Sequence, residues 1–295
     1  MSERTPIESH VAAQIESAEG DLIEYLVGQF PPELHNRLYD EIAEMDEEQS
    51  VFHLSTKLIN RRFALSIKGS EMLASEGVEV IHEYPYAILQ HIEHSQSFAL
   101  DNRLGNGNNG EVIASINQPG TCYKVLFLER AREIAATAAR EALLQHQAGK
   151  VLGGQPGVAR VPSVLRYVDN KDLRAIQMEQ IDGASIKKIL SGEVVLPQNF
   201  DIDIFFTELR NAVELLNAAG IFHRDLINNA GNVIVDKEGK PWIIDFGTAL
   251  RAANFDQDTG TYQLLPGGSW TRSHDIAGVT KMKQELKTFI AKQHA

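Results

Sequence analysis

Two acidic residues stand at the two ends of one short hydrophobic hairpin in the last third of this chain. Asp225 closes the tripeptide His-Arg-Asp, and Asp245 opens the tripeptide Asp-Phe-Gly. Residues 232–236 and 241–245 between them have the pattern of two strands joined by a Lys-Glu-Gly-Lys turn. A carboxylate at the end of so apolar a strand needs a partner, and a metal ion is a good one. Either tripeptide alone occurs by chance in many sequences, whereas their order, separation and intervening strands rarely do.

A glycine-rich segment at residues 104–112 has the spacing G-x-G-x-x-G. Alone this signal is weak, because dinucleotide-binding folds share it and because a mere flexible turn is an alternative. In a dinucleotide-binding fold the glycines open a helix, whereas here residues 111–116 read as a strand. A glycine-rich hairpin between strands lets backbone N–H groups approach phosphates without side-chain obstruction.

The expected secondary structure changes near residue 98, from mainly helical to a mixture of strands and helices. Residues 1 to about 78 have helical periodicity, with helices expected at 6–30, after Pro31, and at 51 to about 74, and residues 79–97 are ambiguous. Strands are expected next, followed by a long helix, two more strands and two further helices. Their ranges are 98–104, 111–117 and 121–127 for the strands, 129–147 for the helix, 161–167 and 173–179 for the later strands, and 184–190 and 201–219 for the last helices.

The charge of the chain is distributed very unevenly. Residues 1–97 hold 6 Lys and Arg against 18 Asp and Glu, which accounts for the whole formal charge of -12. We therefore expect two domains: an acidic, mainly α-helical region at 1–97 with a regulatory or docking role, and a catalytic domain at 98–295. The excess of acidic residues disfavours binding to nucleic acid or to an anionic membrane.

The amino-acid composition also indicates the cellular compartment in which the protein acts. Cys122 is the only cysteine, so an internal disulfide cannot form and a reducing compartment is expected. No Sec-type signal peptide and no membrane span are visible. The expected location is the cytoplasm, or a host-cell cytosol reached through a specialised secretion system.

Residues 98 to about 250 resemble the eukaryotic-type protein kinase core. Five motifs of that core occur here in the same order: the glycine-rich segment, a strand Lys (Lys124) paired with a helix Glu (Glu141), the strand at 173–179, His-Arg-Asp and Asp-Phe-Gly. The resemblance implies an α+β fold of two lobes, a small β-rich lobe at about 98–180 and a helical, shortened lobe at about 181–295. It also implies ATP and Mg²⁺, or Mn²⁺, as cofactors. The reaction would transfer the γ-phosphoryl group to a hydroxyl of a protein substrate, on Ser or Thr.

The same resemblance assigns roles to individual residues. Lys124 would hold the α- and β-phosphates and be kept in place by Glu141. Asp225 would accept the hydrogen of the substrate hydroxyl, and Asp245 would bind Mg²⁺. Met178 would guard the back of the nucleotide pocket, with the backbone of Glu179 and Ile181 facing adenine. The glycine loop that covers the nucleotide would comprise Gly105, Asn106, Gly107, Asn108, Asn109, Gly110 and Val112.

Departures from the family pattern begin at the second metal ligand. The Asn expected five residues after Asp225 is Ala230, so we assign that role to Asn232, with Asn228 and Asn229 as alternatives. The Lys that Ser/Thr kinases place two residues after the catalytic Asp is Ile227, which puts the class of acceptor hydroxyl in doubt.

The end of the chain departs as well. Only 48 residues follow Gly247, and no Ala-Pro-Glu closes an activation segment. Such truncation resembles atypical bacterial kinases, including effectors, and suggests activation by a partner protein or by the N-terminal region. Asp275 is a candidate for the buried carboxylate that braces the catalytic loop. The alternatives to a protein kinase are a small-molecule kinase of the antibiotic or sugar type, a kinase-like nucleotidyl transferase, and a non-catalytic binding module.

Overall fold

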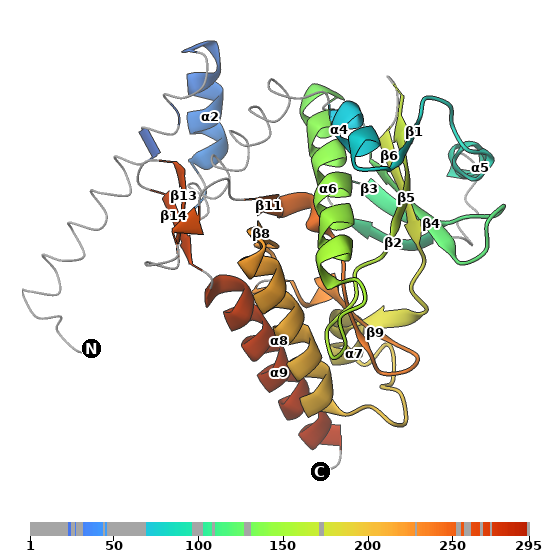
Figure 1. Cartoon of the computed structure of the whole chain (residues 1–295), viewed down its shortest axis with the longest axis vertical. Coiled ribbons are helices and arrows are strands. Elements are labelled where there is room, and N and C mark those ends of the chain that lie inside the picture. The colour runs from blue at the N-terminus through green and yellow to red at the C-terminus, as the bar shows by residue number, and fades with distance from the viewer. Residues whose placement is uncertain are drawn as a thin grey trace, which may run out of the picture.

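The computed structural model describes residues 23–24, 27, 32–43, 45, 69–95, 103–107, 110–126, 131–170, 174–227, 229–251, 255–256, 261–265, 268–271 and 273–293. Over these residues the chain forms a β-rich small lobe and a mainly helical large lobe (Figure 1). The α+β, two-lobed fold expected from the sequence is confirmed. No helix in the described ranges is both long and apolar enough to span a bilayer.

The small lobe is built on one six-stranded sheet with the order β1-β5-β6-β4-β3-β2. All neighbouring strands are antiparallel except β1, which pairs with β5 in parallel. The strands are β1 (Glu79–Ile81), β2 (Arg103–Gly107), β3 (Gly110–Ala114), β4 (Thr121–Leu126), β5 (Val164–Asp169) and β6 (Arg174–Glu179).

Helices cover both faces of this sheet (Figure 1). Helix α6 (Ala131–Leu152) and helix α4 (Gly69–Ser75) pack on one face, where Leu126 and Ile176 are buried with Leu143. Helix α5 (Tyr86–Ser95) lies on the other face, where Ile88 is buried. Because side chains alternate along a strand, Lys124 shares the face of Leu126 and points towards α6.

The region before residue 97 differs from its prediction. The ambiguous residues 79–97 contain β1 and α5, and both are integral to the small lobe through the sheet and its core. The expected helix after Pro31 is present as a 3₁₀ turn, η1 (Pro32–Leu34), and α2 (His35–Ile42). The helix expected at 6–30 lies almost wholly outside the described residues, as do residues 51–68 of the helix expected at 51 to about 74. The end of the latter range is present as α4. A division into two domains at residue 97 stays a prediction.

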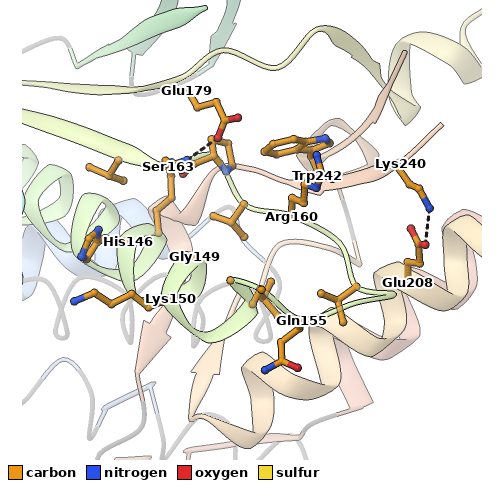
Figure 2. A pocket seen from close by; sticks show the side chains of 18 of the residues that line it. His146, Gly149, Lys150, Gln155, Arg160, Ser163, Glu179, Glu208, Lys240 and Trp242 are labelled. Atoms are coloured by element: carbon orange, nitrogen blue, oxygen red, sulfur yellow. Dashed lines mark hydrogen bonds and ion pairs between the residues drawn. The ribbon is translucent and has the colours of Figure 1, made fainter. Parts of the chain in front are cut away.

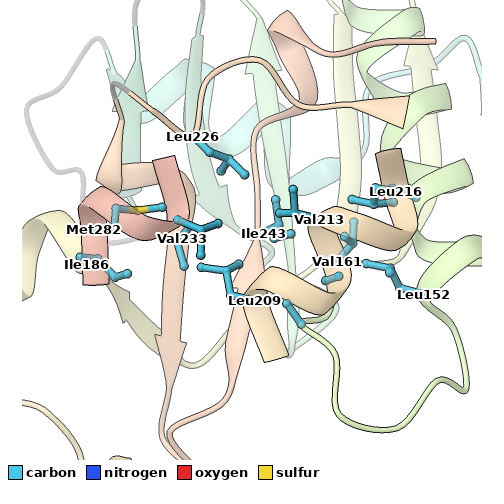
Figure 3. Close-up of a cluster of buried hydrophobic side chains, with 14 of the residues drawn as sticks. Leu152, Val161, Ile186, Leu209, Val213, Leu216, Leu226, Val233, Ile243 and Met282 are labelled. Carbon is cyan, nitrogen blue, oxygen red and sulfur yellow. The ribbon is translucent and has the colours of Figure 1, made fainter. Parts of the chain in front are cut away.

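The large lobe packs two long helices against a β-hairpin. Helix α8 (Ile202–Ala218) starts where the Asp201 side chain accepts the N–H groups of residues 203 and 204, and it ends before Gly220. Leu209 and Val213 of α8 are buried against Ile243 of the hairpin (Figure 3). The hairpin is β9 (Val233–Asp236) and β10 (Pro241–Ile243), and β7 (Gly183–Ser185) pairs with β9. Short helix α7 (Ile186–Leu190) follows β7.

The remainder of the large lobe is short. Its small elements are β8 (Ile221–Phe222), η2 (Ala230–Asn232), η3 (Phe246–Thr248) and β11 (Leu250–Arg251). A three-stranded sheet, not predicted from the sequence, comprises β12 (Phe255–Asp256), β13 (Thr261–Leu265) and β14 (Gly268–Thr271). Helix α9 (Ser273–Gln293) then packs beside α8. A side-chain carbon at Gly278 would lie 2.5 Å from the backbone nitrogen of Ile227, so this glycine lets α9 approach the loop that follows β8.

Candidate active site

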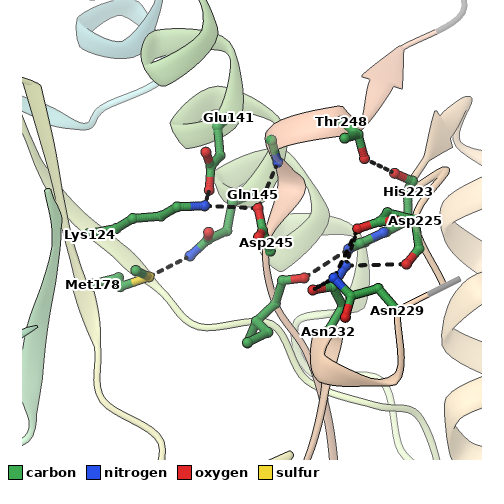
Figure 4. Close-up of polar contacts among 12 residues, drawn as sticks. Lys124, Glu141, Gln145, Met178, His223, Asp225, Asn229, Asn232, Asp245 and Thr248 are labelled. Carbon is green, nitrogen blue, oxygen red and sulfur yellow. Dashed lines mark hydrogen bonds and ion pairs between the residues drawn. The ribbon is translucent and has the colours of Figure 1, made fainter. Parts of the chain in front are cut away.

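Lys124 lies at the centre of an ion-pair network between the lobes (Figure 4). Its Nζ is 2.6 Å from Glu141 Oε1 on α6 and 2.8 Å from Asp245 Oδ1. The side chains of Lys124 and Glu141 are 13% and 2% exposed, so their charges are poorly screened by water. Burial alone would lower the pKa of Lys124, but the two carboxylates raise it above its usual value. The amine is therefore a fixed cation.

The carboxylate of Asp245 remains accessible, with 45% of its side chain exposed. Burial alone would raise its pKa, but the Lys124 ammonium outweighs burial and holds the pKa below its usual value. Its Oδ1 also accepts the Gly247 N–H at 3.3 Å. Among the described residues nothing bonds the second oxygen, Oδ2, so the ionised carboxylate has an oxygen to offer a ligand.

Helix α6 also contacts the Asp-Phe-Gly segment through Arg140, which the sequence analysis did not single out. Arg140 Nη2 donates to the Gly247 carbonyl at 2.6 Å, and the whole Arg140 residue is 3% exposed. Burial lowers the pKa of this guanidinium to about 10, and Glu141 opposes that shift. Phe246 is fully buried and lies edge-on to His223, with the ring centroids 5.0 Å apart. The two residues that follow Asp245 are thus both anchored, which fixes the backbone at Asp245.

Asp225 is bound within its own loop by two asparagines (Figure 4). Asn232 Nδ2 donates to Asp225 Oδ2 at 2.8 Å and to the Asp225 carbonyl at 3.2 Å. Asn229 Nδ2 donates to Asp225 Oδ2 at 3.2 Å and to Asn232 Oδ1 at 3.1 Å. Asn232 therefore lies beside Asp225, whereas the Ala230 side chain has no ligand atom, and the role of Asn232 as a metal ligand stays a prediction. Asn228 lies outside the described residues.

Asp275 braces this loop from α9, as the sequence suggested. Its carboxylate accepts the backbone N–H groups of His223 and Arg224, both at 2.9 Å, and the residue is 5% exposed. Arg224 has a φ of 69°, in the left-handed region that non-glycine residues rarely adopt. The two bonds from Asp275 hold the backbone at that strained position. His223 Nε2 lies 2.8 Å from the Ile244 carbonyl, which ties the loop to the residue before Asp245.

The glycine-rich segment forms a hairpin between two antiparallel strands, as expected. Gly105 and Gly107 lie in β2 and Gly110 opens β3, with Gly107 and Gly110 paired across the turn. Gly105 has open space where a side chain would be, whereas a side-chain carbon at Gly110 would lie 2.1 Å from the Val125 carbonyl oxygen. The third glycine is therefore needed for packing on β4. Asn108 and Asn109 lie outside the described residues, as does the side chain of Asn106.

Val112 is the cross-strand neighbour of Lys124 and shares its face of the sheet. Near the end of β6, the strand next to β4, Met178 is buried and its sulfur lies 3.4 Å from Gln145 Nε2. The Glu179 N–H donates to the Ser163 carbonyl at 3.0 Å, so only the Glu179 carbonyl could face adenine. Within the described residues the Ile181 N–H makes no hydrogen bond. The groups predicted to face adenine therefore narrow to the backbone of Ile181 and the Glu179 carbonyl, which also accepts from Cys122 Sγ at 3.8 Å.

A cavity of about 730 Å³ lies behind Glu179, between the end of α6 and the large lobe (Figure 2). Its charged side chains have partners in the protein: Lys240 pairs with Glu208 at 2.7 Å, and Arg160 lies over the Trp242 ring at 5.5 Å. None of the residues that line it is Lys124, Asp225 or Asp245. It shares Gln145 and Glu179 with the region around Met178 but does not include the ion-pair network of Lys124.

The chain is similar in sequence to several known protein kinases. A probable serine/threonine-protein kinase of Streptomyces coelicolor is 34% identical over 84 residues, covering 28% of this chain and 12% of that protein. The dual specificity mitogen-activated protein kinase kinase mek-2 of Caenorhabditis elegans is 27% identical over 187 residues, 60% of this chain and 46% of that protein. A probable serine/threonine-protein kinase of Clostridium perfringens is 32% identical over 91 residues, 30% of this chain and 13% of that protein. The chain thus matches less than half the length of each of these relatives.

The family model of the protein kinase domain matches residues 98–266, more than half of the chain. This range contains the glycine hairpin, the Lys124 and Glu141 pair, the catalytic loop and Asp245. The chain therefore belongs to the protein kinase family.

Proposed function

We propose that this chain is a protein kinase that transfers the γ-phosphoryl group of ATP, with Mg²⁺ or Mn²⁺, to a hydroxyl of a protein. The observation that carries the proposal is the convergence of three side chains from separate elements. Lys124 bridges Glu141 and Asp245, and Asp225 lies on the loop that His223 ties to the residue preceding Asp245. A buried cation, an accessible carboxylate and a loop carboxylate are what phosphoryl transfer requires.

In this proposal each residue has one task. Lys124, fixed by Glu141, binds the α- and β-phosphates, and the β2–β3 hairpin covers them with backbone N–H groups. The Glu179 carbonyl and the Ile181 N–H bind the adenine edge, and Met178 limits the depth of the pocket. Asp225 orients the acceptor hydroxyl and takes its hydrogen as the oxygen attacks the γ-phosphorus in line.

The residues near Asp245 fit a hard divalent cation. Mg²⁺ prefers oxygen ligands, and Asp245 Oδ2 together with Asn232 Oδ1 would supply a carboxylate and an amide oxygen. The Asn232 amide nitrogen donates to Asp225, and its oxygen, which accepts one hydrogen bond from Asn229 Nδ2, keeps a second lone pair for a ligand. When bound, the ion would neutralise charge on the β- and γ-phosphates.

A protein acceptor is supported by the names of the relatives, two of which are serine/threonine kinases and one a dual specificity kinase. We propose Ser or Thr as the acceptor. Ile227 at the position of the usual Lys leaves this chain without that cation beside the acceptor. We also propose that the acidic N-terminal region binds a regulator or substrate, and that the protein acts in a cytosol, its own or a host's.

The proposal is tested by incubating the full chain with γ-labelled ATP, Mg²⁺ or Mn²⁺, and either cell extract or a panel of small molecules. The expected result is label on protein Ser or Thr, lost in Lys124→Ala and Asp225→Ala. A matched control is Lys237→Ala, because Lys237 is 74% exposed and lies in the turn of the β9–β10 hairpin.

Other outcomes would contradict the proposal in distinct ways. Label confined to small molecules would indicate a small-molecule kinase. Transfer of label from the α-phosphate to protein would indicate a nucleotidyl transferase. Nucleotide binding without transfer of any label would indicate a non-catalytic module.

A further inference from the structure

Residues 69–81 precede the part of the chain that matches the protein kinase domain, which begins at residue 98, yet they form part of the small lobe. Helix α4 ends at Ser75 and is closed by Gly77, whose φ is 86°, and the Val78 N–H then donates to the Leu73 carbonyl at 2.9 Å. Strand β1 follows at once and adds a parallel edge to β5. A seven-residue helix and a three-residue strand are thus fixed to the lobe as one unit.

This unit packs on the side of α6 that faces away from the active site. Glu141 and Gln145 are four residues apart on the side of α6 that faces Lys124 and Met178. The opposite side carries Ala139, Leu143, His146 and Lys150, which repeat at intervals of three and four residues. Leu73 and Val78 are buried in one cluster with Ala139 and Leu143. Helix α6 is therefore enclosed between the active site and α4.

A single residue of the unit, Glu76, contacts three side chains of α6. Its carboxylate accepts from Lys150 Nζ at 2.9 Å and from Gln147 Nε2 at 3.2 Å. Its carbonyl, at the end of α4, lies 3.1 Å from His146 Nε2 and 3.2 Å from Lys150 Nζ. Cationic groups stabilise such carbonyls at a helix C-terminus. The set of contacts from Glu76 to residues 146, 147 and 150 is called the Glu76 clamp below.

We propose that the Glu76 clamp is a positioning device for catalysis, which holds α6 where Glu141 reaches Lys124. The inference rests on the proposed function for its catalytic consequence. Among the described residues, helix α6 contacts the proposed nucleotide site through Arg140, Glu141 and Gln145. The clamp lies one to two turns farther along the same helix, so its loss allows α6 to tilt or slide away from the sheet. Glu141 is then the group whose geometry changes, and Lys124 loses its partner.

The test uses charge reversal in the full chain: Glu76→Lys, Lys150→Glu and the double variant. Each single variant places two like charges together, whereas the double variant restores an opposite pair. Exposed Glu83 supplies the control Glu83→Lys, which makes the same charge change two residues after β1. We expect each single variant to lower kcat by about 3- to 30-fold. Because Glu141 holds the phosphate-binding Lys124, the KM for ATP should rise as well.

A second measurement is independent of phosphoryl transfer. Hydrogen exchange of the α6 backbone amides, followed by mass spectrometry, should be faster in both single variants and should return to the wild-type rate in the double variant. Recovery of kcat in the double variant, with Glu83→Lys unchanged throughout, is the expected result. A merely structural surface pair would not link kcat to α6 exchange in this way.

Two results would overturn the clamp: single variants with wild-type kcat and α6 exchange, or losses that the double variant fails to recover. An equal loss in Glu83→Lys would overturn it too, because the effect would then be one of net charge. If the wild-type chain transferred no phosphate, the proposed function would fail, and α6 exchange would still decide whether Glu76 fixes the helix.

Discussion

The two halves of the candidate site are held together by different interactions. The first half joins Lys124 of β4, Glu141 of α6 and Asp245 through two ion pairs, and these three residues come from different elements. The second half, Asp225 with Asn229 and Asn232, is bonded within eight residues of one loop. The first depends on how α6, the sheet and the large lobe are placed relative to one another. The second is formed by the local chain.

This difference indicates where control of activity can act. A loop whose carboxylate is bonded to its own neighbours, and whose backbone is braced by Asp275, keeps its geometry without help from the small lobe. An ion pair from a helix is lost when that helix moves. Helix α6 is therefore the element through which the N-terminal residues can influence catalysis, and the substitutions below separate the two halves.

The largest effect is expected from breaking the ionic half with Lys124→Met. Glu141, 2% exposed, would lose its cation, and breaking a buried ion pair costs about 3–5 kcal/mol of stability. Loss of a group that stabilises transferred charge should lower kcat/KM by about 10²- to 10³-fold. The double variant Lys124→Met/Glu141→Gln should regain stability in chemical denaturation but no activity. Equal stability of the single and double variants would show that the pair is not buried as described.

Breaking the brace of the second half should cost stability first. Asp275→Ala leaves two buried N–H groups, those of His223 and Arg224, without an acceptor. At about 1–3 kcal/mol for each of the two buried unpaired groups, the free energy of unfolding should fall by roughly 2–6 kcal/mol. Asp203→Ala is the control, since that exposed carboxylate bonds only surface lysines and should change stability little. A wild-type denaturation midpoint for Asp275→Ala would refute the bracing role.

A smaller effect should distinguish the two asparagines that bond Asp225. Asn232 is 3% exposed and is the proposed metal ligand, whereas Asn229 would act only through its neighbours. Loss of a residue that orients a metal ligand costs about 10- to 100-fold, and Asn229→Ala should fall in that range. Asn232→Ala should lose more, and its kcat should depend more steeply on Mg²⁺ concentration. Full activity in Asn232→Ala would show that the register of this loop is misassigned.

The smallest effect is in the pH dependence of stability. The pKa of Asp245 lies below its usual value of 3.8, since Lys124 outweighs the opposing effect of burial. Its ionised form therefore favours the folded state above pH 3.8, and this contribution is lost as pH falls through the folded-state pKa. The stability difference between wild type and Asp245→Asn should be constant near neutral pH and shrink in acid. A difference that grows below pH 3.8 would contradict the ion pair with Lys124.

Most of the site could be predicted because its signals are local. Lys124, Asp225, Asn232 and Asp245 each stand next to a strand or loop with a readable pattern, and the structure brings them into two adjoining groups (Figure 4). The alternation of strands and helices after residue 98 also followed from periodicity, with boundaries shifted by a few residues. Helix α6, for example, ends at Leu152 rather than at Gln147.

What could not be predicted depends on contacts between distant residues. Strand β1 has three residues and pairs with a strand 87 residues later. Three residues are too few to show an alternation of polar and apolar side chains, so the sequence does not mark it as a strand. Arg140 was missed because its one bond goes to the Gly247 carbonyl, which no side-chain pattern marks. The Glu76 clamp was missed for the same reason: a surface Glu reads as solvated until α4 and α6 are placed together.

The central claim is that Lys124, Asp225 and Asp245 serve one nucleotide, and a crystal structure of the full chain with Mg²⁺ and a non-hydrolysable ATP analogue tests it most directly. We expect Lys124 Nζ on the α- and β-phosphates, Asp245 on the metal ion, and Asp225 facing the γ-phosphate from the acceptor side. A nucleotide bound elsewhere, or one in this cleft that leaves any of the three side chains pointing away from its phosphates, would contradict the claim.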